Sequence, residues 1–315
     1  MISIIIPIFN RQHLIDETLN SIIAQTYTNW ECIIVDDGST DDTYNVTNNL
    51  IKGDNRFQLY NRPLEFAKGP SSCRNFAITK MSGNYIQFFD SDDVMHPNHL
   101  QLKIEAIKTH DFVICQLQEF TGAFDANLFS SAKQPYIKPS KNVFEDFATG
   151  TFPMLMVAPL WKASSLRPYI PIREDLHILE DHELYARALS QIKTYAIINT
   201  PLIFYRVGSS SSTNNFYSNV SYGLASYFKA KKTVLHLSSA KPIKLAILKM
   251  TLGFFRLALA KRDFKSAQQC LNFIKNHKLA YSFKLKLKLA RIRFFYTIFK
   301  IVKKGDTKFK PLFKL

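Results

Sequence analysis

The first 120 residues alternate between short apolar segments and longer segments with helical spacing, and this alternation constrains the fold more than any other feature. The apolar segments are rich in β-branched residues, as strands buried on both faces are. Between them, apolar residues such as Leu14, Leu19 and Ile22 recur at helical spacing. The alternation predicts an α/β fold with a mostly parallel sheet and flanking helices. We expect strands at 2–9, 30–35, 57–60, 85–89 and 112–117, and helices at 13–25, 40–51, 71–81 and 97–110.

The pattern weakens after residue 120. Two prolines interrupt the apolar segment 152–161, which favours an edge strand or an extended segment. Strict alternation over 283–289 leaves a strand open there, although helical spacing dominates beyond residue 228. We expect a loop-rich stretch over 122–140, a helix over 180–189, short strands at 195–198 and 202–205, a polar loop over 209–215 and helices after 228.

Charge divides the chain into two parts. Residues 228–315 hold 23 Lys and Arg and two acidic residues, whereas residues 1–227 hold 18 basic and 23 acidic residues. We therefore expect one domain over 1–227. A basic helical region over 228–315 would follow. Nucleic acid and anionic lipid are the two partners that such an excess of positive charge suggests.

The sequence lacks the features of secreted proteins, membrane-spanning proteins, disulfide or zinc scaffolds, and dinucleotide-binding or P-loop proteins. The apolar run at the N-terminus is short for a signal peptide, and no segment offers about 18 apolar residues without charge. Its four cysteines are far apart, which argues against a disulfide scaffold or a zinc ribbon and favours a reducing, cytoplasmic compartment. Neither a dinucleotide-binding glycine motif nor a P-loop occurs.

Asp90, Asp92 and Asp93 follow the fourth predicted strand directly. In an extended segment, Asp90 and Asp92 would point to one side and Asp93 to the other. Two carboxylates that close repel each other, and Mg²⁺ or Mn²⁺ with a substrate diphosphate would relieve that repulsion. The alternative is a solvated acidic turn that caps the next helix.

Two further acidic pairs lie at the ends of predicted elements. Asp36 and Asp37 end the second strand, where they serve as a turn and N-cap or accept hydrogen bonds from a base or a ribose. Glu180 and Asp181 open a helix, where the helix dipole stabilises acidic side chains. A general base at the mouth of the sheet is the functional alternative for this pair.

Seven motifs in this order resemble the family 2 glycosyltransferases, which have the GT-A fold and include bacterial enzymes of polysaccharide biosynthesis. The resemblance covers about residues 1–210, and it implies a GT-A-like catalytic domain over 1–227, with a nucleotide-binding half over about 1–120 and an acceptor-binding half over about 121–227. It rests on SIIIPIFN at 3–10, VDDGSTD at 35–41, RN at 74–75, SGNYI at 82–86, FDSDD at 89–93, ED at 180–181 and YRV at 205–207.

The resemblance implies roles for several residues of these motifs. Pro7, Phe9 and Asp37 would line the nucleotide base of a nucleotide-sugar, most simply a UDP-sugar. Asp90 would meet the ribose or the nucleotide. In the last position of the DxD motif, Asp92 would ligate Mn²⁺ or Mg²⁺.

Asp181 would be the base that deprotonates the acceptor hydroxyl, on a glycan or a lipid-linked acceptor. A positioned carboxylate makes a poor nucleophile reactive, and one direct displacement inverts the anomeric centre. The other implied nucleotide-sugar-binding residues are Asn10, Ser91, Arg74 and Arg206, with the two arginines ordering the site or holding phosphate. One departure from the family pattern is that no His follows Tyr205-Arg206, which leaves open a diphosphate role for residues 209–213.

The basic region beyond residue 228 lies outside the resemblance. Lys284, Lys288 and Arg291 share one helical face, and Leu285, Leu289 and Ile292 share another. A basic amphipathic helix suits peripheral contact with an anionic membrane, here the inner face of the cell membrane. The alternative is a helical subdomain that keeps its lysines for solubility.

Two other functions compete with sugar transfer. A non-catalytic protein that binds nucleic acid or membrane through its basic tail is the main alternative. No recognised nucleic-acid motif is present, so nucleic acid is not expected as a partner. A sugar-phosphate nucleotidyltransferase would need a glycine-rich phosphate loop near the N-terminus, and none is present.

Overall fold

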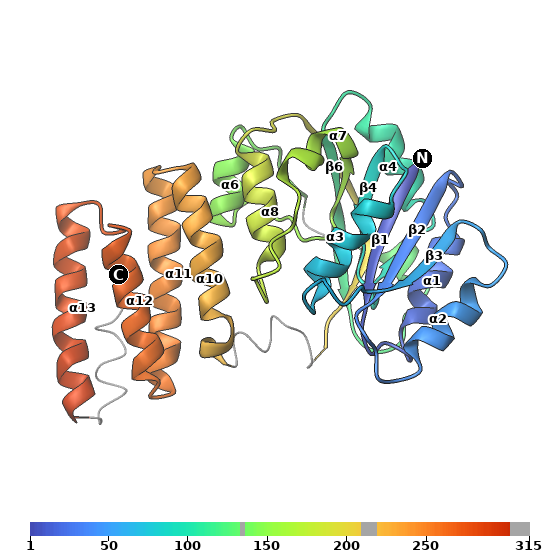
Figure 1. Cartoon of the computed structure of the whole chain (residues 1–315). Coiled ribbons are helices and arrows are strands. Elements are labelled where there is room, and N and C mark those ends of the chain that lie inside the picture. The colour runs from blue at the N-terminus through green and yellow to red at the C-terminus, as the bar shows by residue number, and fades with distance from the viewer. Residues whose placement is uncertain (133–135, 209–218, 303–315) are drawn as a thin grey trace. The chain divides into compact units, whose positions relative to one another are not determined.

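The structure is a computed structural model of the 315-residue chain, and it describes residues 1–132, 136–208 and 219–302. The chain forms two compact units (Figure 1). One comprises Met1–Val143 and the described chain from Phe152 onward to residue 208. The other comprises Phe144–Thr151 and the described chain after residue 218. Residue 227, where the basic region was predicted to begin, lies inside helix α10 (Val220–Leu237).

The first unit is an α/β structure built on one eight-stranded sheet, in the order β3-β2-β1-β4-β7-β6-β8-β5. Its strands are β1 (Ile2–Ile8), β2 (Trp30–Asp36), β3 (Phe57–Asn61), β4 (Tyr85–Phe88), β5 (Val94–Met95), β6 (Phe112–Phe120), β7 (Pro159–Lys162) and β8 (Tyr195–Arg206). Its helices are α1 (Ile15–Ile23), α2 (Thr43–Ile51), α3 (Pro70–Lys80), α4 (His99–Ile107), α5 (Leu128–Ser131), α7 (Ala163–Leu166), the 3-10 helix η1 (Arg167–Tyr169) and α8 (Glu180–Leu189).

The pairing of the strands confirms the predicted mostly parallel sheet. β1 lies between β2 and β4 and is parallel to both, β2 is parallel to β3, and β6 is parallel to β8. The even-numbered isoleucines of β1 share a core with Leu19 of α1 and Leu100 of α4. Because β1 is central and buried, the carboxyl ends of β1, β2 and β4 come together at one edge of the sheet.

Two strand predictions were wrong. β7 is not at an edge: it pairs antiparallel with β4 on one side and β6 on the other, and only its last residues, from Pro159, form the strand. Proline is tolerated there because it occupies the first position of the strand. The two short strands predicted at 195–198 and 202–205 are one strand, β8, which follows β6 through a register irregularity near Gln116.

At the opposite end of β1, a buried carboxylate ties β1 and β2 to the segment that leads into β4. Glu31 of β2 accepts hydrogen bonds from Ser3 Oγ at 2.6 Å, from Ser82 N at 2.7 Å and from Gly83 N at 3.1 Å. Although burial acts to raise the pKa of Glu31, these hydrogen bonds lower it. A Cβ on Gly83 would lie 2.5 Å from Ser3 Oγ and 2.8 Å from Ser3 N, so the chain requires glycine here.

We expect Gly83→Ala to destabilise the first unit by about 1–3 kcal/mol, because the added methyl group meets backbone atoms that cannot move aside. Thermal unfolding measures the change. Gly253→Ala in α11 (Lys241–Ala260) is the control, since the nearest atom to its added Cβ would be 4.0 Å away and alanine favours a helix. An unchanged melting temperature for Gly83→Ala would contradict the close packing described here.

The second unit is helical. It contains α6 (Val143–Thr149), α10, α11, α12 (Phe264–Asn276) and α13 (Phe283–Val302). Residues 283–289, for which a strand was left open, begin α13. Leu289, Ile292 and Tyr296 of α13 are buried, and Tyr296 Oη donates to the carbonyl of Phe264 at 3.3 Å. Along α11, Ile243, Ile247 and Phe254 are buried, whereas Met250 and Leu257 are exposed.

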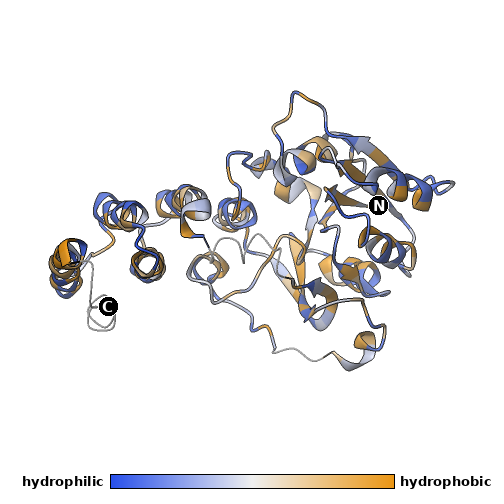
Figure 2. Ribbon diagram, turned by 90° about the horizontal axis from the view of Figure 1, so that it is seen from below, coloured by the Kyte–Doolittle hydropathy of each residue, from blue (hydrophilic) through white to orange (hydrophobic). Residues whose placement is uncertain are grey.

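Hydrophobic and hydrophilic residues both occur along each of these helices (Figure 2). Within the described residues, no helix combines the length and apolar character needed to cross a membrane. All four cysteines are buried, and none of them forms a disulfide.

Candidate functional site

The loops after β1 and β2 are joined by a set of short hydrogen bonds. Asp36 ends β2, and its carboxylate accepts from the backbone N–H groups of Gly38 and Ser39 at 3.1 and 2.9 Å. Asn10 adopts a left-handed backbone conformation, with φ of 51°, and its amide oxygen accepts from Thr40 N at 2.8 Å. The turn chemistry predicted for Asp36 is therefore confirmed, and its carboxylate serves the protein backbone.

Asp37 is held by an arginine that the sequence reasoning missed. Its Oδ1 accepts from Arg62 Nε at 2.5 Å, and both side chains are largely buried. Arg62 directly follows β3, the neighbour of β2, and its N–H donates to the carbonyl of Asp36 at 2.8 Å. The one available signal was a basic residue at the end of the adjacent strand. Beside this pair, Phe9 is 37% exposed, and the Lys68 ammonium lies 4.2 Å from the centre of its ring.

The segment Asp90–Asp93 is a turn and not the extended segment that was predicted, since Asp93 N donates back to the Asp90 carbonyl at 3.4 Å. Asp93 is fully buried, and its Oδ1 accepts from Arg206 N at 2.9 Å. Asp92 stays partly exposed and lies 3.3 Å from Arg11 Nε. Burial, and after it the charge of Asp90, raises the pKa of Asp92, and the same two causes raise that of Asp93 further.

Arg206 at the end of β8 holds this turn in place. Its Nε donates to the Asp92 carbonyl at 2.8 Å, and its guanidinium also contacts Glu17 of α1 and the Gly122 carbonyl. The guanidinium stacks on Phe120 at 4.5 Å. These contacts are compatible with an ordering role for Arg206, and both predicted alternatives, ordering the site and holding phosphate, stay predictions.

Arg74 of α3 joins the acidic turn to the start of α8. Its side chain is only 4% exposed, with one guanidinium nitrogen 2.7 Å from Asp90 Oδ1 and another 3.4 Å from Glu180 Oε1. Although burial acts to lower the pKa of Arg74, the two carboxylates raise it, so the guanidinium stays charged. One buried cation therefore fixes the positions of two acids that are 90 residues apart in the sequence.

Asp181 lies in the first turn of α8, and its carboxyl group has a strongly raised pKa. Burial, and secondly the charge of Glu180, raises the pKa of Asp181 to about 7. Leu179, immediately before the helix, has a left-handed backbone with φ of 63°, which an ordinary side chain adopts at a cost. The chain thus bends sharply to present Glu180 and Asp181.

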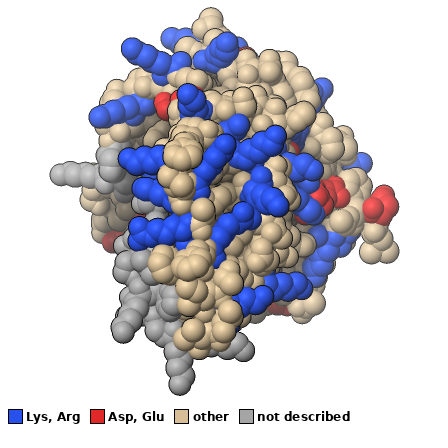
Figure 3. Space-filling view, turned by 90° about the vertical axis from the view of Figure 1, so that its left-hand side faces the viewer, with Lys and Arg blue, Asp and Glu red and all other residues tan. Residues whose placement is uncertain are grey.

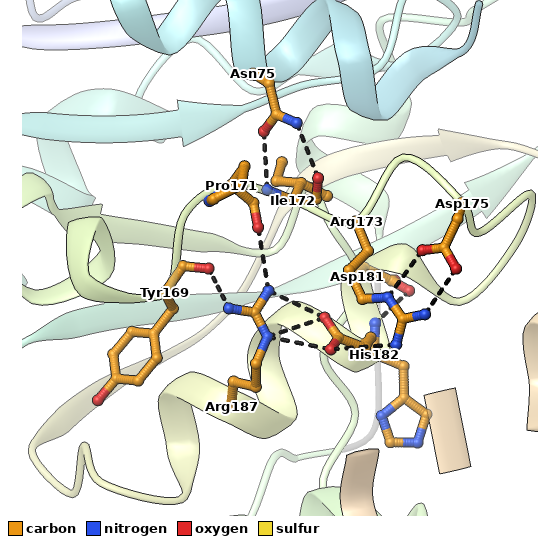
Figure 4. Close-up of polar contacts among 10 residues, drawn as sticks. Asn75, Tyr169, Pro171, Ile172, Arg173, Asp175, Asp181, His182 and Arg187 are labelled. Atoms are coloured by element: carbon orange, nitrogen blue, oxygen red, sulfur yellow. Dashed lines mark hydrogen bonds and ion pairs between the residues drawn. The ribbon is translucent and has the colours of Figure 1, made fainter. Parts of the chain in front are cut away.

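The segment that leads into α8 is anchored by three polar groups (Figure 4). Asn75 of α3 accepts from Ile172 N and donates to the carbonyl of the same residue, each at 2.8 Å. Arg187 of α8 pairs with Glu183 at 3.0 Å and also donates to the carbonyl of Pro171. Arg173 pairs with Asp175 at 2.7 Å. Asn75 follows Arg74 directly, so the RN motif holds both the acids and the segment that carries Asp181.

Tyr205 reports how the acids are grouped. Burial raises the pKa of this phenol, and the charges of Asp90, Asp93, Asp92 and Asp181 raise it further. The structure therefore brings four acids of two sequence motifs around one tyrosine at the end of β8. Tyr205 belongs to the family motif at 205–207, but from the sequence a role was predicted only for Arg206.

The donor set suits a divalent cation that shares its coordination with a ligand. Within the described ranges, no group of three or more His, Cys, Asp or Glu could hold a metal by itself. Asp92 is partly exposed beside a second carboxylate; burial raises the pKa of Asp92, and the charge of Asp90 raises it further. Mg²⁺ and Mn²⁺ are often held by one or two carboxylates with substrate phosphates and water completing the shell. Asp92 fits that arrangement.

Pro7 and Ser91 are two further predicted residues that the structure describes at this edge. Pro7 is partly buried within β1, paired with Val35 of β2. Ser91 is buried inside the acidic turn. The residues 209–213, for which a diphosphate role was left open, lie outside the described residues.

A mostly parallel sheet with acids gathered at the carboxyl ends of its strands is the arrangement of a nucleotide-binding α/β protein. The chain belongs to glycosyl transferase family 2, whose sequence model matches residues 3–162, about half of the chain. It is therefore a member of a family of nucleotide-sugar-dependent glycosyltransferases, as the motifs predicted.

Similar curated proteins are bacterial glycosyltransferases. The chain is 27% identical over 264 residues to an uncharacterized glycosyltransferase of Haemophilus influenzae, covering 81% of this chain and 97% of that protein. It is 40% identical over 105 residues to the Escherichia coli UDP-Glc:alpha-D-GlcNAc-diphosphoundecaprenol beta-1,3-glucosyltransferase WfgD, covering 33% and 40%. A match of 38% identity to an uncharacterized glycosyltransferase of Rickettsia bellii spans 36% of this chain and only 16% of that longer protein.

Solved structures confirm the fold. Staphylococcus aureus TarS (residues 1–349, in complex with UDP-GlcNAc) superposes with a TM-score of 0.62 at 16% identity, covering 95% of this chain and 88% of that one. The Pyrobaculum calidifontis mannosyltransferase PcManGT, in complex with GDP-Man and Mn²⁺, gives 0.59 at 15% identity, covering 96% and 88%. At these identities the likeness establishes the GT-A fold.

Replacing Arg74 by methionine should destabilise the protein by about 3 kcal/mol, because two acids then lose their buried partner. Chemical denaturation measures the loss. The control is Arg173→Met, whose ion pair with Asp175 is a third to a half exposed and should contribute less than about 1 kcal/mol. Equal losses in the two variants would contradict the central role of Arg74.

Proposed function

We propose that the protein is an inverting, metal-dependent glycosyltransferase that moves a sugar from a UDP-sugar to a hydroxyl of a glycan or lipid-linked acceptor in surface polysaccharide synthesis. The observation that carries the proposal is the position of Asp181. This acid lies in the first turn of α8, which Arg74 links to the Asp90–Asp93 turn through Glu180, and its pKa of about 7 suits a general base at neutral pH.

Asp181 accepts the proton of the acceptor hydroxyl as that oxygen attacks the anomeric carbon of the donor sugar. The bond from this carbon to the diphosphate oxygen breaks in the same displacement, so the configuration at the carbon inverts. A positioned base of matched pKa contributes roughly 10²–10⁴-fold to such a step. Arg74 keeps Asp181 within the influence of the acidic turn, because it binds both Asp90 and Glu180.

The donor nucleotide is proposed to lie along the loops after β1 and β2. Phe9, with its exposed ring, and Pro7 would contact the base, while Asn10 and Asp37 would supply polar contacts. The Arg62 ion pair fixes the orientation of the Asp37 carboxylate before the nucleotide arrives. Preformed polar groups bind at a lower entropic cost than mobile ones.

Asp92 would hold Mn²⁺ or Mg²⁺ together with the donor diphosphate, with Asp90 and Ser91 beside it in the same turn. When bound, the cation neutralises charge that develops on the departing diphosphate. Arg11 contacts Asp92 at 3.3 Å, so this carboxylate already has a cationic partner in the protein alone.

The activity of one similar protein and the ligands bound in two similar structures support the choice of donor and acceptor. WfgD uses UDP-Glc and an acceptor on diphosphoundecaprenol, and the TarS structure contains UDP-GlcNAc. PcManGT was solved with GDP-Man and Mn²⁺, which supports a metal-bound nucleoside diphosphate more generally. A UDP-sugar is our proposal for this chain, with GDP-sugars as the comparison to test.

Asp92→Ala should abolish the metal-dependent binding of UDP, because the carboxylate proposed to hold the cation is lost. In the wild-type protein, UDP with Mn²⁺ at about 100 times Kd should stabilise the fold by roughly 2.7 kcal/mol, a rise of several degrees in Tm. GDP, dTDP, CMP and ATP form the comparison panel. Asp16→Ala, an exposed acid of α1, should keep the full shift. A wild-type protein that responds to none of these nucleotides would contradict the proposal.

The pH dependence of donor turnover should follow Asp181. Below about pH 7 the base is protonated in a growing fraction of molecules, so kcat/KM for release of UDP should fall tenfold per pH unit. In Glu180→Gln the pKa of Asp181 loses one of the charges that raise it, so the falling limb should move to lower pH. Asp175→Asn, in the same segment, should leave it in place. A limb that does not move in Glu180→Gln would contradict this assignment.

We also propose that residues 228–315 bring the enzyme to the inner face of an anionic membrane. This range holds 23 basic and only two acidic residues, and its excess of positive charge supports that contact. Exposed apolar side chains on α13, including Phe294 and Leu287, accompany the basic ones.

A further inference from the structure

The second unit contains a basic pocket that plays no part in the proposed sugar transfer. It has a volume of about 510 Å³ and lies among α11, α12 and α13. Ile274, Ala280 and Leu289, all buried, form its apolar part. Five cationic side chains also line it, and these are Lys244, Lys275, Lys278, Lys286 and Arg293.

The pocket lies at one end of this group of helices. Lys244 is in the first turn of α11, Lys286 is in the first turn of α13, and Lys275 is in the last turn of α12. The first turns of α11 and α13 and the last turn of α12 therefore border the pocket, and because helix ends of both kinds meet there, its positive charge comes from the side chains. Lys244 and Arg293 are partly buried, which restricts where their charges can go.

Among the residues that the structure describes, no acidic side chain pairs with these cations. Between residues 219 and 302 the only acid is Asp263, which caps the other end of α12 by accepting from Ser266 N at 2.9 Å. Figure 3 shows Lys and Arg side chains crowded on this side of the molecule with few acidic ones. Like charges held together repel, and a bound anion would remove that repulsion.

Lys278 occupies a position that usually takes glycine. The end of α12 has two closing hydrogen bonds, from Leu279 N to the Ile274 carbonyl and from Lys278 N to the Lys275 carbonyl, both at 3.1 Å. This is a Schellman motif, in which the penultimate residue is left-handed, and Lys278 accordingly has φ of 50°. Glycine avoids the strain of that conformation, whereas a lysine there places a fifth cation at the pocket.

We propose that this pocket binds a phosphomonoester or diphosphate group. Several converging donors from Lys and Arg match the multiple charges and oxygens of such a group. A nucleic acid strand would need a longer groove with aromatic platforms, and Tyr281 is the one aromatic residue that lines this pocket. The group comes from a lipid headgroup or from a free phosphate compound, and the experiment separates these sources.

The test uses the full chain and two double variants of equal net charge. Lys275→Gln with Lys278→Gln removes two exposed cations of the pocket without removing buried side chains. Lys249→Gln with Lys261→Gln removes two exposed cations outside it. Calorimetry in EDTA measures the binding of inorganic pyrophosphate. Flotation measures binding to phosphatidylcholine vesicles that contain phosphatidic acid, or phosphatidylglycerol at the same surface charge.

We expect the pocket variant to lose about tenfold or more in affinity for pyrophosphate, and the control variant less than about twofold. A preference of the wild type for phosphatidic acid over phosphatidylglycerol, lost only in the pocket variant, would identify a lipid headgroup. Pyrophosphate binding without that preference would identify a free phosphate compound.

Equal losses in both variants would overturn the proposal, because general surface charge would then explain the binding. A wild type that neither binds pyrophosphate nor prefers phosphatidic acid would overturn it as well. The outcome is independent of the proposed sugar transfer, because no donor, divalent cation or turnover enters the measurement. A donor site that also took up pyrophosphate would affect all three proteins equally.

Discussion

The buried ion pairs of Arg74 hold the active edge of this protein together. Its guanidinium lies between Asp90, at the end of β4, and Glu180, at the start of α8. Without a cation there, the acids at this edge would repel one another, and the chain would have to hold them apart or protonated. The acidic turn is joined to the start of α8 through this one side chain, and its positive charge limits how far burial and the charge of Glu180 raise the pKa of Asp181.

A similar logic separates the two ends of the sheet. At the amino end, Glu31 is saturated by hydrogen bonds from Ser3, Ser82 and Gly83, so its charge is satisfied and it serves the fold. At the carboxyl end, Asp92 and Asp181 have raised pKa values and remain partly exposed. Acids that the protein satisfies hold the structure together, whereas acids that it leaves under electrostatic stress are available for a metal, a nucleotide or a proton.

Much of this could be predicted because the signals are local. Helix and strand periodicities identified most elements of the first unit, and the order of short motifs identified the family. Position in the sheet was harder to predict. The prolines near β7 favoured an edge strand, yet Pro159 begins a strand in the middle of the sheet, where pairing from both sides outweighs the local preference. The roles of Arg11 and Arg62 were missed because their acidic partners are distant in the sequence. Arg11 contacts Asp92, and Arg62 contacts Asp37.

The sequence by itself determined the α/β class, the family, the acids of the candidate site and the concentration of positive charge after residue 228. These are properties of residue type, spacing and order, which do not depend on knowing what lies nearby in space. Only the tertiary structure decided which acid each arginine holds, that Asp90–Asp93 forms a turn, and that five cations of three helices surround one pocket. The physical reason is that burial and Coulomb interactions depend on distances between residues far apart in the chain, and folding alone sets those distances.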